Sequence, residues 1–328
     1  MRVVDPRRWV VTCDPGIDDA VALAVAAGRD DCVVRAVVAG AGNVDAPTAW
    51  RNARGLAALL GLDVPVAMGS AATVDGRPIH REGHAHGTDG LAGLARRLPH
   101  PGGGPPGARL GAPAGAPNAP TDGGSLVGGD VVATGPLTDV ALALRAGRPV
   151  GRVVWMGGSY APAAAGPGPV GHEFNAGVDP QAVDEVLVDA VDLAVVPIEV
   201  TRRVTLGPQD LARWSSGLPP ARLCADLAGR RPRRDGHRIG LHDPVAVVAA
   251  LESELFRWER RRVRCVAGSG DAPQGALVAV AGSGDARPGA LVAVAGPPSA
   301  AIAVDVDAPA VRDRIVDAVL AAGRPQHG

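Results

Sequence analysis

Short apolar segments alternate with segments of helical character along much of the chain, and this alternation limits the possible folds more than any other feature. Residues 9–13 and 32–39 are apolar runs of strand length, and residues 18–27 between them have the length and composition of a helix. Short buried strands that alternate with helices are typical of parallel βαβ units, whose helices cover both faces of a sheet. The pattern predicts an α/β protein built on one doubly wound, mostly parallel open sheet.

The alternation continues through most of the remaining chain. Further strands are expected at residues 65–68, 130–134, 152–156, 192–197 and 301–306. Further helices are expected at residues 47–60, 138–146, 180–189, 244–252 and 311–321. The length of 328 residues allows two domains or one large α/β domain, and we predict a single domain over residues 1–328.

Two stretches depart from the alternation. Residues 101–128 are rich in Gly and Pro, which do not form a packed core, and are predicted to be a surface insert. Residues 266–279 recur almost verbatim as residues 280–293. Two copies are too few for a solenoid, so we interpret this 14-residue repeat as a local duplication of a strand and turn.

Composition excludes several classes of protein. Hydrophobic residues make up 46% and charged residues 20%, as in soluble globular proteins, and the formal net charge is −1. A near-neutral chain lacks the basic surface that binds nucleic acid or anionic lipid, and 2% aromatic residues offer little for base stacking. Apolar runs are too short to span a bilayer, and early charged residues leave no apolar segment for a signal peptide. We therefore expect a cytoplasmic protein without membrane or nucleic-acid partners.

Three carboxylates follow the first predicted strand, in the segment Asp14-Pro15-Gly16-Ile17-Asp18-Asp19. Carboxylates this close together repel one another unless a positive charge lies between them. Acids at the start of a helix are also stabilised by the helix dipole, so helix capping is the alternative interpretation. That would explain one acid, but three around a Pro-Gly turn favour a hard cation such as Ca²⁺, which prefers oxygen ligands.

Other polar residues also lie near the ends of predicted strands, where ligands bind in an open parallel sheet. They are Asn43, Thr134, Glu173, Asn175, His242 and Asp243. Each alone is a weak signal, because an Asp before Pro is an ordinary helix N-cap. Their convergence on strand ends is what an active site needs.

These motifs carry a resemblance to a known family. Residues 14–20 resemble the N-terminal signature of the inosine-uridine-preferring nucleoside hydrolase family. Its companion motifs follow in the family's order: Gly42-Asn43, His86-Gly87-Thr88-Asp89-Gly90-Leu91, Thr134-Gly135-Pro136-Leu137-Thr138, Met156-Gly157-Gly158, Glu173-Phe174-Asn175 and His242-Asp243-Pro244. The resemblance covers residues 10–248 and implies the family's Rossmann-like fold, with helices on both faces of the sheet.

The resemblance also implies a function. It implies an N-glycosyl hydrolase that splits ribonucleosides into ribose and free base with a bound Ca²⁺, in purine or pyrimidine salvage, as a homodimer or homotetramer. The implied metal ligands are the side chains of Asp14, Asp19 and Asp243 and the backbone carbonyl of Thr134. Asp14 would also be the general base on the metal-bound water, and Asn43 would help to position the water and the metal ligands.

Substrate contacts follow from the same resemblance. The implied ribose contacts are Asp18, Glu173, Asn175 and Met156. His242 would protonate or polarise the departing base, because His titrates in a useful range of pH, and His86 would lie over the base. The transition state would resemble an oxocarbenium ion, which nearby carboxylates stabilise. The alternative interpretations are a core position for Met156 and a solvated loop position for His86.

Two positions depart from the family pattern. Thr12 stands where the family usually has an Asp, and Pro167 stands where many relatives have an Asn. These departures leave open a catalytically weak or silent member that binds nucleoside or ribose, and a hydrolase of a modified nucleoside. A magnesium phosphohydrolase is a further interpretation of the acidic turn, but it would need a phosphate site at a strand end.

Basic residues precede the last motif, where the family often has aromatic residues. They are Arg231, Arg233, Arg234, His237 and Arg238. We interpret them as a solvated basic face of a helix. The alternative is a pocket for a substrate or leaving group of acidic character.

Overall fold

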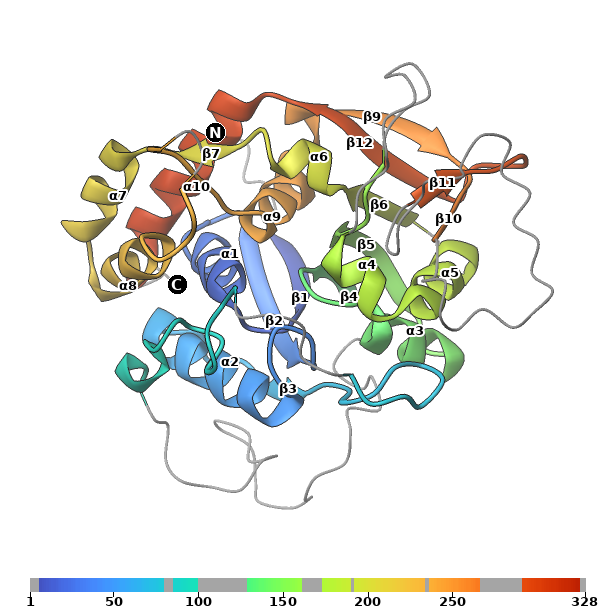
Figure 1. Cartoon of the computed structure of the whole chain (residues 1–328), viewed down its shortest axis with the longest axis horizontal. Coiled ribbons are helices and arrows are strands. Elements are labelled where there is room, and N and C mark those ends of the chain that lie inside the picture. Colours follow the sequence, from blue (N-terminus) through green and yellow to red (C-terminus); the bar gives the residue numbers. More distant parts are fainter. Residues whose placement is uncertain are drawn as a thin grey trace.

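The computed structural model describes residues 6–79, 85–99, 129–160, 173–189, 192–233, 236–265 and 291–324. Its central feature is an eight-stranded sheet in the order β3-β2-β1-β4-β5-β6-β12-β9 (Figure 1). The strands are β1 (Arg7–Cys13), β2 (Cys32–Ala39), β3 (Val66–Met68), β4 (Gly129–Ala133), β5 (Val150–Met156), β6 (Asp192–Val196), β7 (Thr205–Leu206), β8 (Ile239–Gly240), β9 (Phe256–Arg261), β10 (Val263–Cys265), β11 (Leu291–Ala293) and β12 (Ala300–Val306). The helices are α1 (Ile17–Ala27), α2 (Ala46–Leu60), α3 (Thr138–Arg145), α4 (Phe174–Val178), α5 (Pro180–Asp189), α6 (Ile198–Thr201), α7 (Pro208–Ser215), α8 (Pro219–Ala228), α9 (Asp243–Leu251) and α10 (Ala308–Ala321), with short 3-10 helices at Ala95–Arg97 and Ser253–Leu255.

The sheet is parallel except at one edge. Every pairing from β3 across to β12 is parallel, and β9 pairs with β12 in the antiparallel direction. The chain starts at β1, runs outward through β2 to β3, and then returns to place β4 on the other side of β1. The order of strands therefore reverses between β1 and β4, and such a switch point is where open α/β sheets bind ligands.

Helices cover both faces of the sheet, as the sequence predicts. Successive residues of β1 point to opposite faces: Trp9 and Val11 belong to one buried cluster and Val10 to the other. Most buried apolar residues of α1, α2, α8, α9 and α10 lie in the first cluster, and those of α3 and α5 lie in the second. The doubly wound α/β fold is confirmed.

Helix α1 is enclosed along its length, and this decides where its acids lie. All its residues from Ile17 to Ala26 are buried, because α1 contacts α8, α9 and α10 as well as the sheet. Asp18 and Asp19 occupy its first turn, at the edge where β1 ends. Their carboxylates are therefore held inside the protein and not in bulk water.

The predicted elements agree with the structure where the strand–helix alternation is regular. The strand at 32–39 and the helix at 180–189 are confirmed at both ends, and most other boundaries differ by one to three residues. The interpretation of the basic residues after position 230 as a helix face is wrong, because α8 ends at Ala228 and the described residues 231–233 and 236–238 belong to no helix. A glycine at position 229 follows the helix end directly.

Some expectations fall outside the described residues. These are the insert at 101–128, residues 266–290 of the duplication, and Pro167 and Arg234. In the described part of the chain, no helix is long and apolar enough to cross a membrane.

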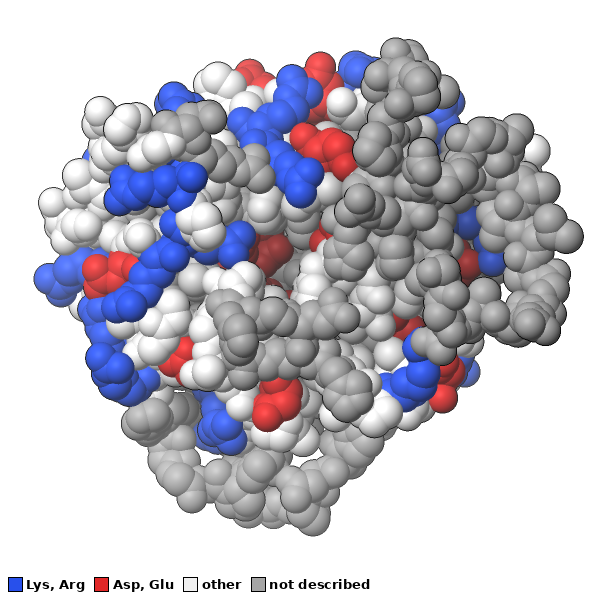
Figure 2. Space-filling model, in the orientation of Figure 1, with Lys and Arg blue, Asp and Glu red and all other residues white. Residues whose placement is uncertain are grey.

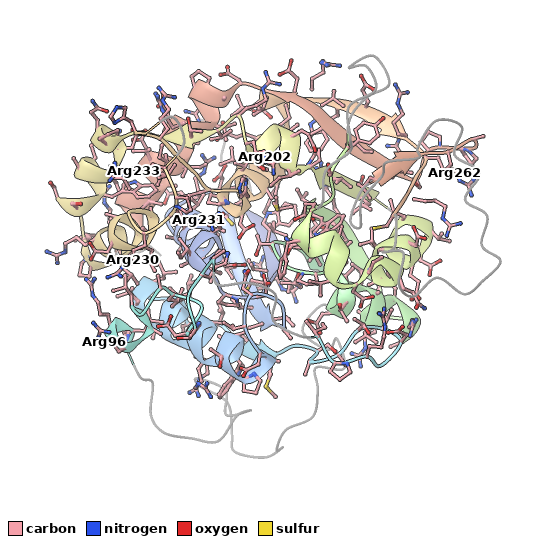
Figure 3. The ribbon with its side chains drawn as sticks, in the orientation of Figure 1. Arg96, Arg202, Arg230, Arg231, Arg233 and Arg262 are labelled. Atoms are coloured by element: carbon pink, nitrogen blue, oxygen red, sulfur yellow. The ribbon has the colours of Figure 1, made fainter. Side chains whose placement is uncertain are left out.

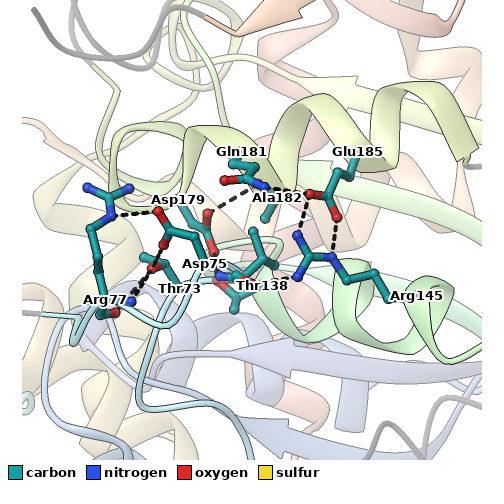
Figure 4. A network of polar contacts seen from close by, with 10 residues as sticks. Thr73, Asp75, Arg77, Thr138, Arg145, Asp179, Gln181, Ala182 and Glu185 are labelled. Atoms are coloured by element: carbon teal, nitrogen blue, oxygen red, sulfur yellow. Dashed lines mark hydrogen bonds and ion pairs between the residues drawn. The ribbon is translucent and has the colours of Figure 1, made fainter. Parts of the chain in front are cut away.

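A buried carboxylate joins the loop after β3 to the helices on one face (Figure 4). Asp179 accepts hydrogen bonds from the Val74 amide at 2.9 Å, the Thr138 hydroxyl at 2.8 Å and the Ala182 amide at 3.1 Å. Nearby, Arg145 pairs with Glu185 at 2.6 Å. These contacts hold the loop against α3 and α5.

Candidate active site

The candidate site lies where β1 and β4 end side by side. The Thr134 amide donates to the Thr12 carbonyl at 2.8 Å, so the residues that follow the two strands start from adjacent points. Asp14 follows β1, and Thr134 follows β4. In Figure 2, acidic side chains lie deep in a hollow near the middle of the face, and basic side chains lie along its rim.

Asp14 and Asp19 share a buried hydrogen-bond network. Asp14 Oδ2 accepts from the Asn43 amide at 2.7 Å. Asp19 Oδ1 accepts from the Thr134 hydroxyl at 2.8 Å, and its Oδ2 accepts from the Gly16 amide at 2.8 Å. The Asn43 side-chain amide also approaches Asp19 Oδ2, at 3.4 Å. Asn43 and Thr134 therefore contact the acidic turn.

A glycine permits the close approach of the neighbouring loop. A Cβ atom at Gly42 would lie 2.0 Å from Asp14 Oδ2, so a larger residue there would displace the carboxylate or the loop. This explains why Gly precedes Asn43 in the Gly42-Asn43 motif.

Burial and mutual repulsion disfavour the charged forms of Asp14, Asp19 and Asp243. Burial, followed by the charge of Asp19, raises the pKa of Asp14. Burial raises the pKa of Asp19 to about 6, although hydrogen bonds from Gly16 and Thr134 oppose the shift. Burial and the neighbouring Asp residues also raise the pKa of Asp243, at the start of α9. Asp14 Oδ1 is buried, and no described residue donates a hydrogen bond to it.

The predicted metal ligands are of the right chemical type for a hard cation, but their side chains are not arranged as a metal site. Among the described residues, no three His, Cys, Asp or Glu side chains are arranged so that they could hold a metal ion. The donors are nevertheless buried oxygens, and one of them has no hydrogen-bond partner among the described residues. Burial, together with neighbouring carboxylates, raises the pKa values of Asp14 and Asp243. A hard cation among them would relieve both the repulsion and the missing contact. The residues therefore fit Ca²⁺ in chemistry.

Asp18 faces a different set of groups. Its Oδ2 accepts from the His242 amide at 2.9 Å, and its Oδ1 lies 3.3 Å from Arg231 Nε. Burial opposes its ionisation, but the charges of Arg231, His242 and His86 outweigh burial and lower the pKa of Asp18. Of these four buried Asp residues, Asp18 is the one whose pKa is lowered, whereas the pKa values of Asp14, Asp19 and Asp243 are raised.

His86 is tied to the start of α1. Its Nδ1 accepts a hydrogen bond from the Ile17 amide at 2.9 Å, and burial lowers the pKa of its imidazole. The ring is half-buried, so the interpretation of His86 as a solvated loop residue is wrong.

On the other side of the site, Glu173 and Asn175 connect β4, β5 and α4. Glu173 caps α4 and accepts from the amides of Gly158 at 2.7 Å, Ala176 at 2.9 Å and Asn175 at 3.1 Å. The Asn175 side-chain amide donates to the carbonyls of Thr134 at 2.9 Å and Met156 at 3.0 Å.

Met156 is 2% exposed and belongs to a buried cluster, as the core interpretation predicts. Its thioether sulfur, Sδ, also lies 3.7 Å from the Asn175 side-chain amide nitrogen. The residue is therefore both a core residue and a neighbour of the predicted ribose contacts.

Comparison with known proteins identifies the family. Residues 9–313 match the family described as inosine-uridine preferring nucleoside hydrolase. The chain belongs to this family. Members are N-glycosyl hydrolases, so the predicted enzyme class is confirmed together with the predicted family.

Individual relatives agree with the family assignment. The pyrimidine-specific ribonucleoside hydrolase RihA of Salmonella typhimurium is 31% identical over 320 residues, covering 91% of this chain and 93% of the relative. RihA of Photobacterium profundum is 33% identical over 267 residues, covering 76% of this chain and 81% of the relative.

Solved structures of nucleoside hydrolases share the fold. The plant nucleoside hydrolase PpNRh1 matches with a TM-score of 0.74 and 24% identity, over 96% of this chain and 99% of that chain. A purine-preferring ribonucleoside hydrolase from Gardnerella vaginalis matches with a TM-score of 0.74 and 19% identity, over the same shares of the two chains.

Two polar residues near the active site of this nucleoside hydrolase, Thr201 and Glu199, were not predicted from the sequence. The Thr201 hydroxyl lies 2.9 Å from His242 Nδ1. Glu199 contacts the Ser159 hydroxyl and accepts from the Tyr160 amide at 2.9 Å. Both residues lie on α6, just beyond the end of β6, so a systematic search of strand ends would have found them.

Of the two positions that depart from the family pattern, Thr12 lies within the described residues. It is buried at the end of β1, next to the acidic turn. Its hydroxyl has no hydrogen-bond partner among the described residues, while its carbonyl accepts from the Thr134 amide. The backbone contact that joins β1 to β4 is therefore kept without an acid at position 12.

Proposed function

We propose that this chain hydrolyses the N-glycosidic bond of pyrimidine ribonucleosides to ribose and free base, and that the reaction depends on Ca²⁺. The relatives named pyrimidine-specific, at 31% and 33% identity, support the choice of pyrimidines. The observation that carries the proposal is the buried cluster of Asp14, Asp19 and Asp243 at the sheet switch point, in which one carboxylate oxygen of Asp14 has no hydrogen-bond partner among the described residues.

The cation would be held by Asp14, Asp19, Asp243 and the carbonyl of Thr134. Some of these oxygens already accept hydrogen bonds: Thr134 O from Asn175, and Asp19 Oδ1 from Thr134. Carbonyl and carboxylate oxygens each have a second lone pair, so these bonds do not prevent coordination. When bound, the divalent cation would lower the pKa of a water molecule and so supply a nucleophile near neutral pH.

Asp14 is the proposed general base. Its Oδ1 is the buried acceptor without a hydrogen bond from the described residues, so it is available to receive a proton from the attacking water. The cation would offset the burial and the charge of Asp19 that raise the pKa of Asp14, so the carboxylate would be ionised and able to accept that proton. Asn43 holds the other carboxylate oxygen and so orients the base.

The ribose would lie between Asp18 and the Glu173–Asn175 segment. The lowered pKa of Asp18 keeps its carboxylate charged, so it can accept a hydrogen bond from a ribose hydroxyl. Glu173 adds negative charge that stabilises an oxocarbenium-like transition state, while its hydrogen bonds hold the amides of Gly158 and Asn175 in place.

His242 is the proposed proton donor to the departing base. Thr201 contacts its Nδ1, and we assign the protonation of the base to its other ring nitrogen, Nε2. The C1′–N bond then breaks, its electron pair goes to the base, and the water oxygen bonds to C1′.

The test is release of free base from uridine, cytidine, inosine and adenosine by the purified full chain, before and after chelation of calcium. We expect uridine or cytidine to react fastest, chelation to abolish the reaction, and added Ca²⁺ to restore it. The Asp14→Asn variant should be inactive, and Asp30→Asn, at an exposed site, should match the unmodified chain. Release that persists after chelation would contradict the calcium dependence. Absence of release from every riboside with calcium present would contradict the function.

A further inference from the structure

Arg231 enters the candidate site from the loop after α8, and the proposed mechanism does not use it. Its side chain is 14% exposed, and its Nε lies 3.3 Å from Asp18 Oδ1. The neighbouring Arg230 and Arg233 are exposed. Figure 3 shows Arg231 nearer to α1 and the centre of the molecule than either neighbour. Arg231 is therefore part of the site and not of a solvated basic surface.

Asp18 orients this guanidinium on the same side of the site as His242. One Asp18 oxygen faces Arg231 Nε, and the other accepts from the His242 backbone amide. The position of Nε is thus set by a carboxylate that is itself 4% exposed and held at its other oxygen. Within the described ranges, no hydrogen bond joins Arg231 Nη1 or Nη2 to another residue. No described residue therefore occupies the forked end of the guanidinium.

The chemistry of a guanidinium group restricts what that ligand can be. Arg is always charged in proteins, and it has five N–H donors and no acceptor. Its forked end favours groups that carry negative charge or pairs of acceptor oxygens. It disfavours an edge made of amino groups, because two donors would face each other.

The leaving base gains such charge during the reaction. When the C1′–N1 bond of uridine breaks, its electron pair goes to N1 and is shared with the two carbonyl oxygens of uracil. The proton of the attacking water goes to Asp14, and the water oxygen bonds to C1′. Before it is protonated, uracil is an anion with oxygen acceptors. Positively charged donors placed in advance at such an anion lower the energy of the transition state.

We propose that Arg231 is a specificity-determining residue that binds the carbonyl oxygens of the departing base and stabilises its negative charge. The substrates that it favours are ribosides whose bases can leave as anions, such as uridine, over those whose bases must be protonated first, such as adenosine. The inference rests on the proposed function and assigns a substrate class to the same site. Arg231 and His242 would then have different roles: Arg231 stabilises the anionic base, and His242 supplies its proton.

The test compares leaving groups of different acidity on the same sugar. The substrates are uridine, 5-bromouridine, 5-fluorouridine and 4-nitrophenyl β-D-ribofuranoside, whose leaving group needs little help. In Arg231→Gln, we expect kcat/KM for uridine to fall about 100-fold, as when one preorganised donor to a developing anion is removed. The loss should shrink as the leaving group becomes more acidic and should be about threefold or less for the nitrophenyl riboside. Arg233→Gln, which changes an exposed Arg two residues away, should behave as the unmodified chain.

The dependence on leaving-group acidity distinguishes the outcomes. An equal loss on all four substrates would mean that Arg231 only positions Asp18, and would overturn the proposal. If Arg231→Gln does not fold, as judged by its melting temperature, Arg231→Lys carries the test, because it keeps the charge but loses the fork. We expect it to lose more activity on uridine than on the nitrophenyl riboside, and an equal loss would again overturn the proposal. An unmodified chain without activity on any of the four substrates would instead contradict the proposed function.

Discussion

The hydroxyl of Thr201 lies 2.9 Å from His242 Nδ1 and joins the segment after β6 to the residue that precedes α9. Thr201 is fully buried, and its hydroxyl also donates to the Ile198 carbonyl at 3.2 Å. The imidazole therefore contacts a rigid, packed helix turn. This contact and the Asp18 bond to the His242 amide together set the direction in which the ring points.

Replacement of Thr201 by Val should weaken catalysis more than stability. Val has nearly the same shape but no hydroxyl, so the ring loses one orienting contact. A hydrogen bond of this kind contributes about 0.5–1.5 kcal/mol, and we expect kcat on uridine to fall roughly 3- to 10-fold. Thr201→Ser keeps the hydroxyl and serves as the control. Equal kcat values in the Val variant and the unmodified chain would show that the contact does not orient His242.

Replacement of Asp14 by Asn should inactivate the enzyme while raising its stability without calcium. The Asp14 carboxylate is buried beside Asp19, and its raised pKa reports an unfavourable charge. Asn keeps the shape and removes the repulsion, so we expect the melting temperature of the chelated protein at pH 8 to rise by several degrees. Asp30→Asn, at an exposed position, is the control. A lower melting temperature in Asp14→Asn would contradict the view that charge repulsion between the clustered carboxylates destabilises the calcium-free protein.

Replacement of Glu173 by Gln should lower both stability and activity. The Glu173 carboxylate accepts from three backbone amides, at Gly158, Asn175 and Ala176. The amide nitrogen of Gln would face at least one of these donors and leave it without a partner, at a cost of about 1–3 kcal/mol. We expect denaturant unfolding to show this loss and uridine hydrolysis to slow. Glu254→Gln, on an exposed turn, should change neither quantity.

The stability of the fold should depend on pH through Asp139, outside the acidic turn. Asp139 accepts from the Ser70 amide at 2.9 Å, and burial raises its pKa to about 6. The folded chain therefore keeps the proton of Asp139 at pH values where the unfolded chain has lost it. This group's contribution to stability falls as pH rises from about 4 through 6, and above that range the fold must bury a charge.

Asp139→Asn should remove this penalty. The advantage of the variant over the unmodified chain should grow from pH 4 to pH 7 and reach at most roughly 3 kcal/mol. Thermal unfolding at several pH values measures it, with the exposed Asp63→Asn as control. A difference that stays constant over this range would mean that burial does not shift the ionisation of Asp139.

Local sequence determined much of the fold and the acidic turn. Apolar runs and helical periodicity located most strands and helices, because these patterns reflect the burial of one side of each element. The carboxyl ends of parallel strands meet at one edge of a sheet, so polar residues at those ends indicated where Asp14, Asn43 and Thr134 would meet. Less regular segments, such as α7, α8 and β9, were missed, since they do not follow the strand–helix alternation.

Tertiary structure alone decided which strands are neighbours and which side chains reach the site from distant segments. The antiparallel addition of β9 beside β12 depends on packing between segments far from the first strands, and a local pattern does not encode it. The segment 231–238 is rich in basic residues, yet Arg231 lies beside the buried carboxylate of Asp18 while Arg233 is exposed. Thr201 likewise meets His242 only because α6 and α9 pack near the same edge of the sheet. Short-range sequence patterns specify the acidic turn and the elements around it, whereas charge pairing and packing between distant segments select the partners of each group.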